Sequence, residues 1–118
     1  MAGTSQDVRR VWYTRSTEDW TTPVPLADTT RAPSWQWYAT GPVAGIQLQH
    51  GPYEGRLIVP ANHSDSNAEA GPGQYRSHLL FSEDGGESWA RGGSLAPLTN
   101  ESTVVELTDG QLMLNARS

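Results

Sequence analysis

The sequence predicts an all-β fold made of short antiparallel strands joined by tight turns. Glycine and proline supply 12 and 8 of the 118 residues, a share that suits many turns and disfavours long helices. Short runs rich in β-branched and aromatic residues recur between these turns, as expected of pleated strands. No segment keeps the apolar period of about 3.6 residues that an amphipathic helix needs.

The expected strands follow one another along the chain, each bounded by turn-forming residues. They are 8–14, 45–49, 56–60, 77–81, 89–92, 103–107 and 111–116. Thr108-Asp109-Gly110 joins the last two and is a strong hairpin signal, because glycine accepts a positive φ at little cost. Residues 19–33 and 64–74 are rich in Pro, Asp, Ser, Thr and Gly and are expected to be loops.

Two of the hairpins resemble each other, which indicates an internal repeat. The stretches 45–61 and 103–116 share an order of apolar residues, and Gly55 and Gly110 hold matching positions in them. A period of about 55 residues that carries about four strands is typical of β-propeller blades. We therefore expect one partial propeller domain over the whole chain, with approximate blades at 8–63 and 75–118. Two blades alone would leave unpaired strand edges and favour aggregation.

The net charge and the residue counts exclude several classes of function. The chain has eight arginines, no lysine and a net charge of −5, so it offers no basic surface to nucleic acid. The absence of cysteine excludes disulfides and thiolate chemistry. The three histidines lack zinc spacing, so neither a metal nor another cofactor is expected. No apolar run is long enough for a membrane segment, and residues 1–10 lack the apolar core of a signal peptide. The cellular location stays open.

The segment 82–89 reads Ser-Glu-Asp-Gly-Gly-Glu-Ser-Trp and suits a tight hairpin turn. The side chains of Ser82 and Asp84 can bond backbone groups of the turn. Gly86 can take a conformation that a Cβ blocks, and Trp89 can pack beneath it. This motif resembles the Asp-box, or bacterial neuraminidase (BNR) repeat, of sialidases and related propellers, which implies a structural role for these four residues. A shortened copy lies at 13–20, where the tryptophan directly follows the aspartate.

The last hairpin carries a second resemblance. It reads Glu101-Ser-Thr-Val-Val-Glu-Leu-Thr-Asp-Gly-Gln-Leu-Met-Leu-Asn-Ala-Arg117 and is similar to the exo-α-sialidase segment in which a glutamate precedes a hairpin that ends in an arginine. The resemblance implies a six-bladed propeller and a retaining glycoside hydrolase that releases terminal sialic acid from glycoconjugates. In that family the glutamate activates a tyrosine nucleophile and the arginine grips the substrate carboxylate. Glu101 is therefore the candidate catalytic residue and Arg117 a candidate substrate-binding residue.

These residue types suit the chemistry of sialic acid. Its anomeric carbon carries a carboxylate that would repel an anionic nucleophile, whereas a neutral tyrosine that gives its proton to a glutamate avoids the repulsion. A guanidinium donates two parallel hydrogen bonds to a carboxylate and stays charged. Two simpler interpretations stay open. Glu106 could be the functional acid and Glu101 a turn residue, and Arg117 could cap a solvated strand.

The middle of the chain is similar to a further sialidase stretch. By that resemblance Tyr38, Asn62 and His63 would approach the sugar. Residues 43–44 are Val-Ala where the family usually has Gly-His, which changes the polar contact of that loop. The family's nucleophilic tyrosine has no counterpart here. We therefore expect an internal fragment that is inactive alone and that depends on the remaining propeller blades of a longer protein.

The alternative function is that of a non-catalytic Asp-box propeller segment in a carbohydrate-binding or adhesion protein. Such a protein would keep the 82–89 turn but has no reason to hold Glu101 and Arg117 in register. The two hypotheses differ in one geometric prediction. A sialidase requires both side chains at one rim, whereas the alternative is favoured if they lie on opposite faces.

Overall fold

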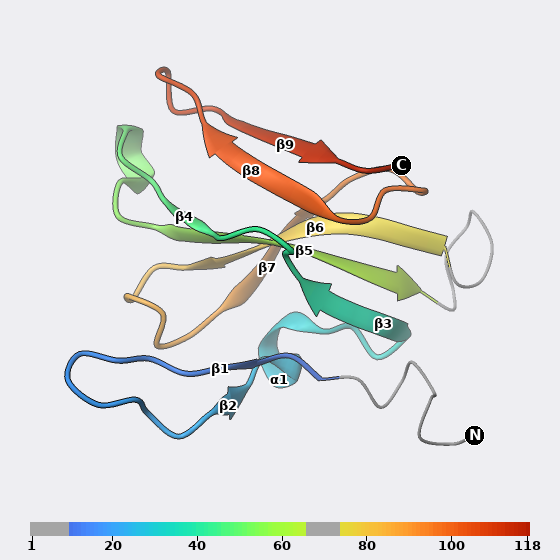
Figure 1. Ribbon diagram of the computed structural model, residues 1–118. Helices are drawn as coiled ribbons and strands as arrows, with labels where there is room; N and C mark the ends of the chain where they lie inside the picture. The colour runs from blue at the N-terminus through green and yellow to red at the C-terminus, as the bar shows by residue number, and fades with distance from the viewer. Residues whose placement is uncertain (1–9, 66–73) are drawn as a thin grey trace.

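The computed structural model of the protein describes residues 10–65 and 74–118 (Figure 1). Almost all of its regular structure is β, which confirms the predicted fold class. The elements are β1 (Trp12–Tyr13), β2 (Val24–Pro25), α1 (Ala27–Thr30), β3 (Trp35–Thr40), β4 (Ile46–Gln47), the 3-10 helix η3 (Gly51–Tyr53), β5 (Leu57–Asp65), β6 (Gln74–Ser82), β7 (Ala90–Ser94), β8 (Ser102–Glu106) and β9 (Leu112–Ala116).

A five-stranded antiparallel sheet forms the centre of the molecule. Four strands lie in the order β3-β5-β6-β7, and β4 also pairs with β5. β5 and β6 pair along their whole lengths, from Leu57 opposite Ser82 to Asp65 opposite Gln74. The expected blades were 8–63 and 75–118. Because β5 lies mostly in the first and β6 mostly in the second, this one sheet contains strands from both. The physical reason is that similarity between hairpins identifies repeated units but not which strands share hydrogen bonds.

Proline in a central strand usually disrupts the ladder, because it has no N–H to donate. Pro60 avoids this cost by its position in β5. Along one side of β5, Ile58 pairs with β4 and Ala61 pairs with β3, so Pro60 falls at the change of partner. Its carbonyl still accepts a hydrogen bond of 2.9 Å from the backbone N–H of Gly41 on that side. The proline therefore marks the point where β3 ends and the chain turns towards β4.

Side chains along β5 and β6 alternate between the two faces of the sheet, and each face has its own apolar core. The first core consists of Leu26, Trp35, Tyr38, Ala61 and Leu80. The second consists of Leu48, Ile58 and Val104. In Figure 1 the β8–β9 hairpin lies over one face of the sheet, and β1, β2 and α1 lie over the other. The sheet is thereby the middle layer of three.

Two local predictions were wrong. The segment 19–33, expected to be a loop, contains β2 and α1, and β3 was not among the predicted strands. A helix of four residues is too short to show an apolar period. It ends at Thr30, whose backbone N–H and hydroxyl both donate to the Leu26 carbonyl, at 3.1 and 2.6 Å. Among the described residues, no helix has the length and apolar character needed to cross a bilayer.

Candidate functional site

The β8–β9 hairpin places Glu101 and Arg117 side by side. Its turn closes with Gly110 at a φ of +84°, and its ladder runs to the pair Ser102 and Ala116. One position further out, the backbone N–H of Arg117 donates to the Glu101 carbonyl at 2.8 Å. The two side chains form an ion pair, with Arg117 Nε 3.2 Å from Glu101 Oε2. Residues sixteen positions apart in sequence thus meet because the hairpin register continues beyond both strands.

The two residues of the ion pair line a shallow pocket of about 350 Å³. Pro42 and Val43 line the pocket from the loop before β4, and a bridge between Pro42 and Ser102 holds that loop against β8. The side chains of Arg117 and Glu101 are 64% and 49% exposed. An exposed ion pair contributes at most about 1 kcal/mol to folding, so this pair adds little to the stability of the hairpin. Both groups are accessible to a ligand.

Glu106 has a different role from Glu101. Its carboxylate accepts hydrogen bonds from the backbone N–H groups of Gln49 and His50, at 2.7 and 3.2 Å. These bonds tie the end of β8 to the loop before η3, at the opposite end of the hairpin from Glu101. The carboxylate of Glu106 is therefore occupied in holding a loop. The geometry favours Glu101 as the acid with functional access.

The three further residues predicted to approach the sugar lie inside the protein. Tyr38, Asn62 and His63 are only 2–3% exposed, and none of them lines the pocket beside Glu101 and Arg117. The Tyr38 hydroxyl shares a hydrogen bond of 2.6 Å with the Thr30 hydroxyl. Asn62 accepts a hydrogen bond of 2.7 Å from the indole N–H of Trp37. Their contact with a sugar stays a prediction, and their burial argues against it.

A buried histidine pair was not anticipated from the sequence. His63 lies opposite Arg76, and His78 opposite Ala61, so the two imidazoles are diagonal neighbours on one face of the sheet. Their Nδ1 atoms are 2.9 Å apart. Since a single proton occupies the space between two Nδ1 atoms, one ring donates and the other accepts, and the accepting ring is neutral. Only the register of β5 and β6, which the sequence does not state, reveals this pair.

Burial sets the titration of both imidazoles. Trp35 stacks on His63 with ring centroids 3.6 Å apart. Loss of hydration lowers the pKa of His63 to about 4, where Asp65 opposes the shift and two arginines add to it. Loss of hydration, with repulsion from His63 and Arg91, lowers the pKa of His78 to about 3. Neither imidazole therefore changes its charge near neutral pH, and the histidine pair is a structural part of the buried core.

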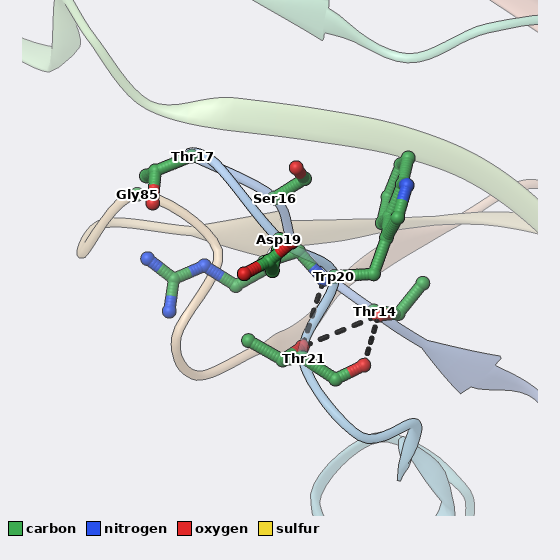
Figure 2. Close-up of a pocket in the computed structure, with 8 residues that line it drawn as sticks. Thr14, Ser16, Thr17, Asp19, Trp20, Thr21 and Gly85 are labelled. Carbon is green, nitrogen blue, oxygen red and sulfur yellow. Dashed lines mark hydrogen bonds between the residues drawn. The ribbon is translucent and has the colours of Figure 1, made fainter.

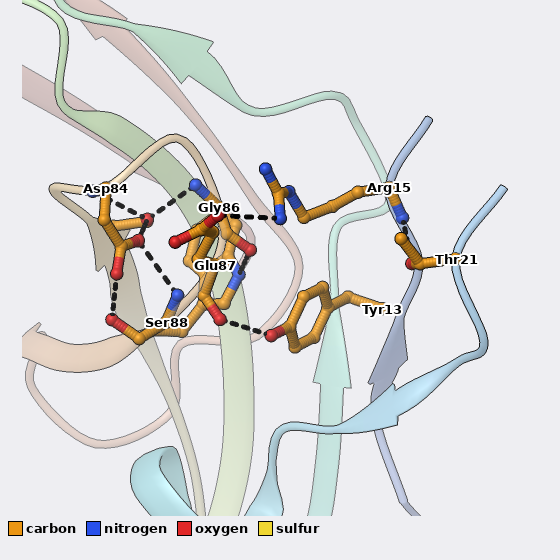
Figure 3. A network of polar contacts seen from close by, with 9 residues as sticks. Tyr13, Arg15, Thr21, Asp84, Gly86, Glu87 and Ser88 are labelled. Carbon is orange, nitrogen blue, oxygen red and sulfur yellow. Dashed lines mark hydrogen bonds and ion pairs between the residues drawn. The ribbon is translucent and has the colours of Figure 1, made fainter. Parts of the chain in front are cut away.

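The 82–89 turn is closed by its own side chains. The Ser82 hydroxyl donates to Asp84 at 2.8 Å and accepts from the Gly86 N–H at 2.8 Å. Asp84 also accepts from the N–H and hydroxyl of Ser88, which lowers the pKa of its carboxyl to about 2. Gly86, at a φ of +89°, accepts the indole N–H of Trp89 at 3.2 Å. Figure 3 shows these bonds within the turn.

An antiparallel β fold that carries an Asp-box turn is typical of BNR-repeat β-propeller proteins. The profile of the BNR repeat-like domain family matches residues 2–118, and the chain belongs to this family. Among the described residues, no group of three or more His, Cys, Asp or Glu side chains could hold a metal ion.

Two curated sialidases are similar in sequence. The sialidase of Bacteroides fragilis strain YCH46 is 31% identical over 106 residues, which are 87% of this chain and 18% of that protein. The sialidase of Micromonospora viridifaciens is 35% identical over 91 residues, 77% of this chain and 13% of that protein. The chain thus spans less than a fifth of the curated relatives that it matches.

A solved structure has the same fold. Hadza microbial sialidase Hz136 superposes with a TM-score of 0.77 at 27% identity, over 92% of this chain and 20% of that one. The fold is therefore that of part of a sialidase-type β-propeller, and the chain is a sialidase-like BNR domain segment.

Proposed function

We propose that the chain supplies part of the active site of an exo-α-sialidase, a retaining glycoside hydrolase that releases terminal sialic acid from glycoconjugates. The observation that carries the proposal is the exposed ion pair of Glu101 and Arg117, which lines a pocket. Glu101 takes a proton from a tyrosine nucleophile that a segment outside this chain supplies, and Arg117 binds the substrate carboxylate. The remaining blades complete the site.

The geometry of Arg117 suits this division of roles. Its contact with Glu101 goes through Nε, so the terminal amino groups of the fork can donate to a second carboxylate. Glu101 in turn competes with the substrate for the same guanidinium. Removal of the Glu101 charge should therefore strengthen the binding of sialic acid by Arg117 while it abolishes the activation of tyrosine. Opposite effects on binding and on catalysis distinguish this role from a structural one.

Catalysis can be tested in a chimera that replaces the matched segment of the Micromonospora viridifaciens sialidase with this chain. Glu101→Gln should lower kcat for an aryl sialoside by about 100-fold or more, the usual contribution of a general base. Glu106→Gln is the matched control on the same hairpin and should leave kcat within about threefold of the parent chimera. Retention of full activity by the Glu101→Gln chimera would overturn the proposal.

Binding can be tested in the 118-residue chain itself, without a working active site. Sialic acid at about 10 mM should shift the Arg117 Nε–H resonance in a nitrogen–proton NMR spectrum, as expected of a millimolar complex. The shift should grow in Glu101→Gln and vanish in Arg117→Ala. An unchanged Arg117 resonance in both the parent chain and Glu101→Gln would remove Arg117 from substrate binding. The alternative, a non-catalytic sugar-binding segment, would be supported if Arg117 binds sialic acid and the chimera works equally well with Glu101→Gln.

A further inference from the structure

A second pocket lies at the other end of the strands from the ion pair of Glu101 and Arg117. Its volume is about 420 Å³, and its walls are the loop between β1 and β2 together with Gly85 of the Asp-box turn (Figure 2). In Figure 1 the β1–β2 loop and the β6–β7 turn point to the side opposite the C-terminus. A ligand in this pocket would therefore not touch Glu101 or Arg117.

The most exposed aromatic side chain of the described residues stands in this pocket. Trp20 is 72% exposed, and Figure 2 shows its indole extending away from the loop. In the intact Asp-box turn, by contrast, the tryptophan is half-buried and its indole N–H is bonded to the turn. Trp20, in the shortened copy of the motif, therefore does not pack against its own turn as Trp89 does. The face of the Trp20 indole is therefore available to stack against a ligand.

The loop that carries Trp20 is held in one conformation at its neck. The Thr14 hydroxyl donates to the Thr21 carbonyl at 2.5 Å, and the Thr21 hydroxyl accepts from the Arg15 N–H at 3.0 Å. The Thr21 N–H closes the loop by donating to the Arg15 carbonyl at 2.7 Å. A loop fixed in this way presents Trp20 with little loss of conformational entropy on binding.

The neck is also attached to the Asp-box turn. The Tyr13 hydroxyl donates to the Glu87 carbonyl at 2.5 Å, and the Arg15 guanidinium lies 3.5 Å from the Glu87 carboxylate (Figure 3). Two turns from distant parts of the sequence thus form one continuous wall. The pocket is consequently a feature of the folded sheet and not of the loop alone.

We propose that this pocket binds a neutral pyranose unit of a glycan. The C–H bonds on one face of a pyranose carry a small positive charge and pack against the negative face of an indole. Hydroxyl and charged groups also line the pocket, among them Thr17 and Asp19, and can bond the sugar hydroxyls. The charge of Arg15 is balanced by Glu87, and Asp19 leaves these three groups with a net charge of −1. The site therefore disfavours sialic acid and other anionic sugars, so it is distinct in ligand from the proposed active site.

The test uses the isotope-labelled 118-residue chain and lactose, a neutral disaccharide. Lactose should shift the indole N–H resonance of Trp20 with a Kd of about 1–10 mM, the range expected of one stacked sugar ring. Trp20→Ala should abolish the binding, whereas Trp20→Tyr, which keeps an aromatic face, should retain part of it. Trp12→Ala is the matched control, since Trp12 is 57% exposed on β1, and should bind lactose as the parent chain does. The spectra report at the same time whether each variant is folded.

Three outcomes would overturn the proposal. These are no shift of Trp20 at about 50 mM lactose, well above the expected Kd, unchanged binding by folded Trp20→Ala, and sialic acid binding at Trp20 as tightly as lactose. The proposal does not depend on sialidase activity. Arg117→Ala should leave lactose binding unchanged, so failure at one site is distinguishable from failure at the other.

Discussion

Mild acid should destabilise the folded chain through His63 and His78. In the unfolded chain each imidazole has a pKa near 6.5, whereas burial lowers the pKa to about 4 and about 3 in the folded chain. Between these values the unfolded chain binds more protons than the folded chain. The free energy of unfolding therefore falls as the pH falls below about 6.5, and this part of the stability is fully present above that pH.

The decrease in the free energy of unfolding at pH 5 depends only on how the two histidines titrate in the unfolded chain. Both folded-state pKa values lie below 5, so both rings stay neutral in the folded chain at that pH. The gap of about 1.5 pH units corresponds to about 2 kcal/mol for each histidine, and to about 4 kcal/mol for the pair. With a denaturant slope of about 2 kcal/mol per molar urea, the urea midpoint should fall by about 2 M.

The assay is urea unfolding followed by tryptophan fluorescence, at about pH 7.5 and about pH 5, a range above most carboxyl titration. The double variant His63→Gln/His78→Gln should lose most of the pH dependence, although it will be less stable at both pH values. His50→Gln, a change at the exposed histidine, is the matched control and should keep it. A parent midpoint that is the same at both pH values, or a full shift in the double variant, would refute the reasoning.

Three further changes should have distinct effects. Leu80→Ala removes a side chain with 0% exposure from the first core and should cost about 2–5 kcal/mol in urea unfolding, while Leu107→Ala on the surface should cost under about 1 kcal/mol. Asp84→Ala removes the acceptor for Ser88 and should lower the thermal midpoint. The low pKa of its carboxyl, about 2, predicts that the parent loses this contribution only as the pH falls below about 4. Glu106→Ala should speed amide exchange at Gln49, whose N–H it binds, and unchanged exchange there would contradict the role assigned to it.

Much of the local structure was predictable from the sequence, because turns and hairpins depend on neighbouring residues. The glycine turns at 82–89 and 108–110 follow from the need for a positive φ, and both are present. The approach of Glu101 to Arg117 was also predictable, since a tight hairpin sets its own register and carries it to both ends. The catalytic roles of these two residues stay proposals.

The placement of Tyr38, Asn62 and His63 was not predictable in the same way. Their motif resembles one from sialidases, but β3, β5 and β6 bury Tyr38 and His63 beside Trp35 and His78, and they bury Asn62 on the other face of the sheet, against Trp37. Pairing between strands that are distant in sequence depends on loop closure and on the packing of both sheet faces. Sequence similarity carries no direct information on either.

The sequence by itself determined the all-β class, the Asp-box turn and the hairpin that joins an acid to a guanidinium, because each arises from interactions within a few residues. Only the tertiary structure decided which strands share a sheet, that two histidines are neutral and buried, and that Trp20 faces solvent beside a second turn. These features arise where segments distant in sequence compete for the same buried surface, and the fold with the best packing and satisfied hydrogen bonds prevails.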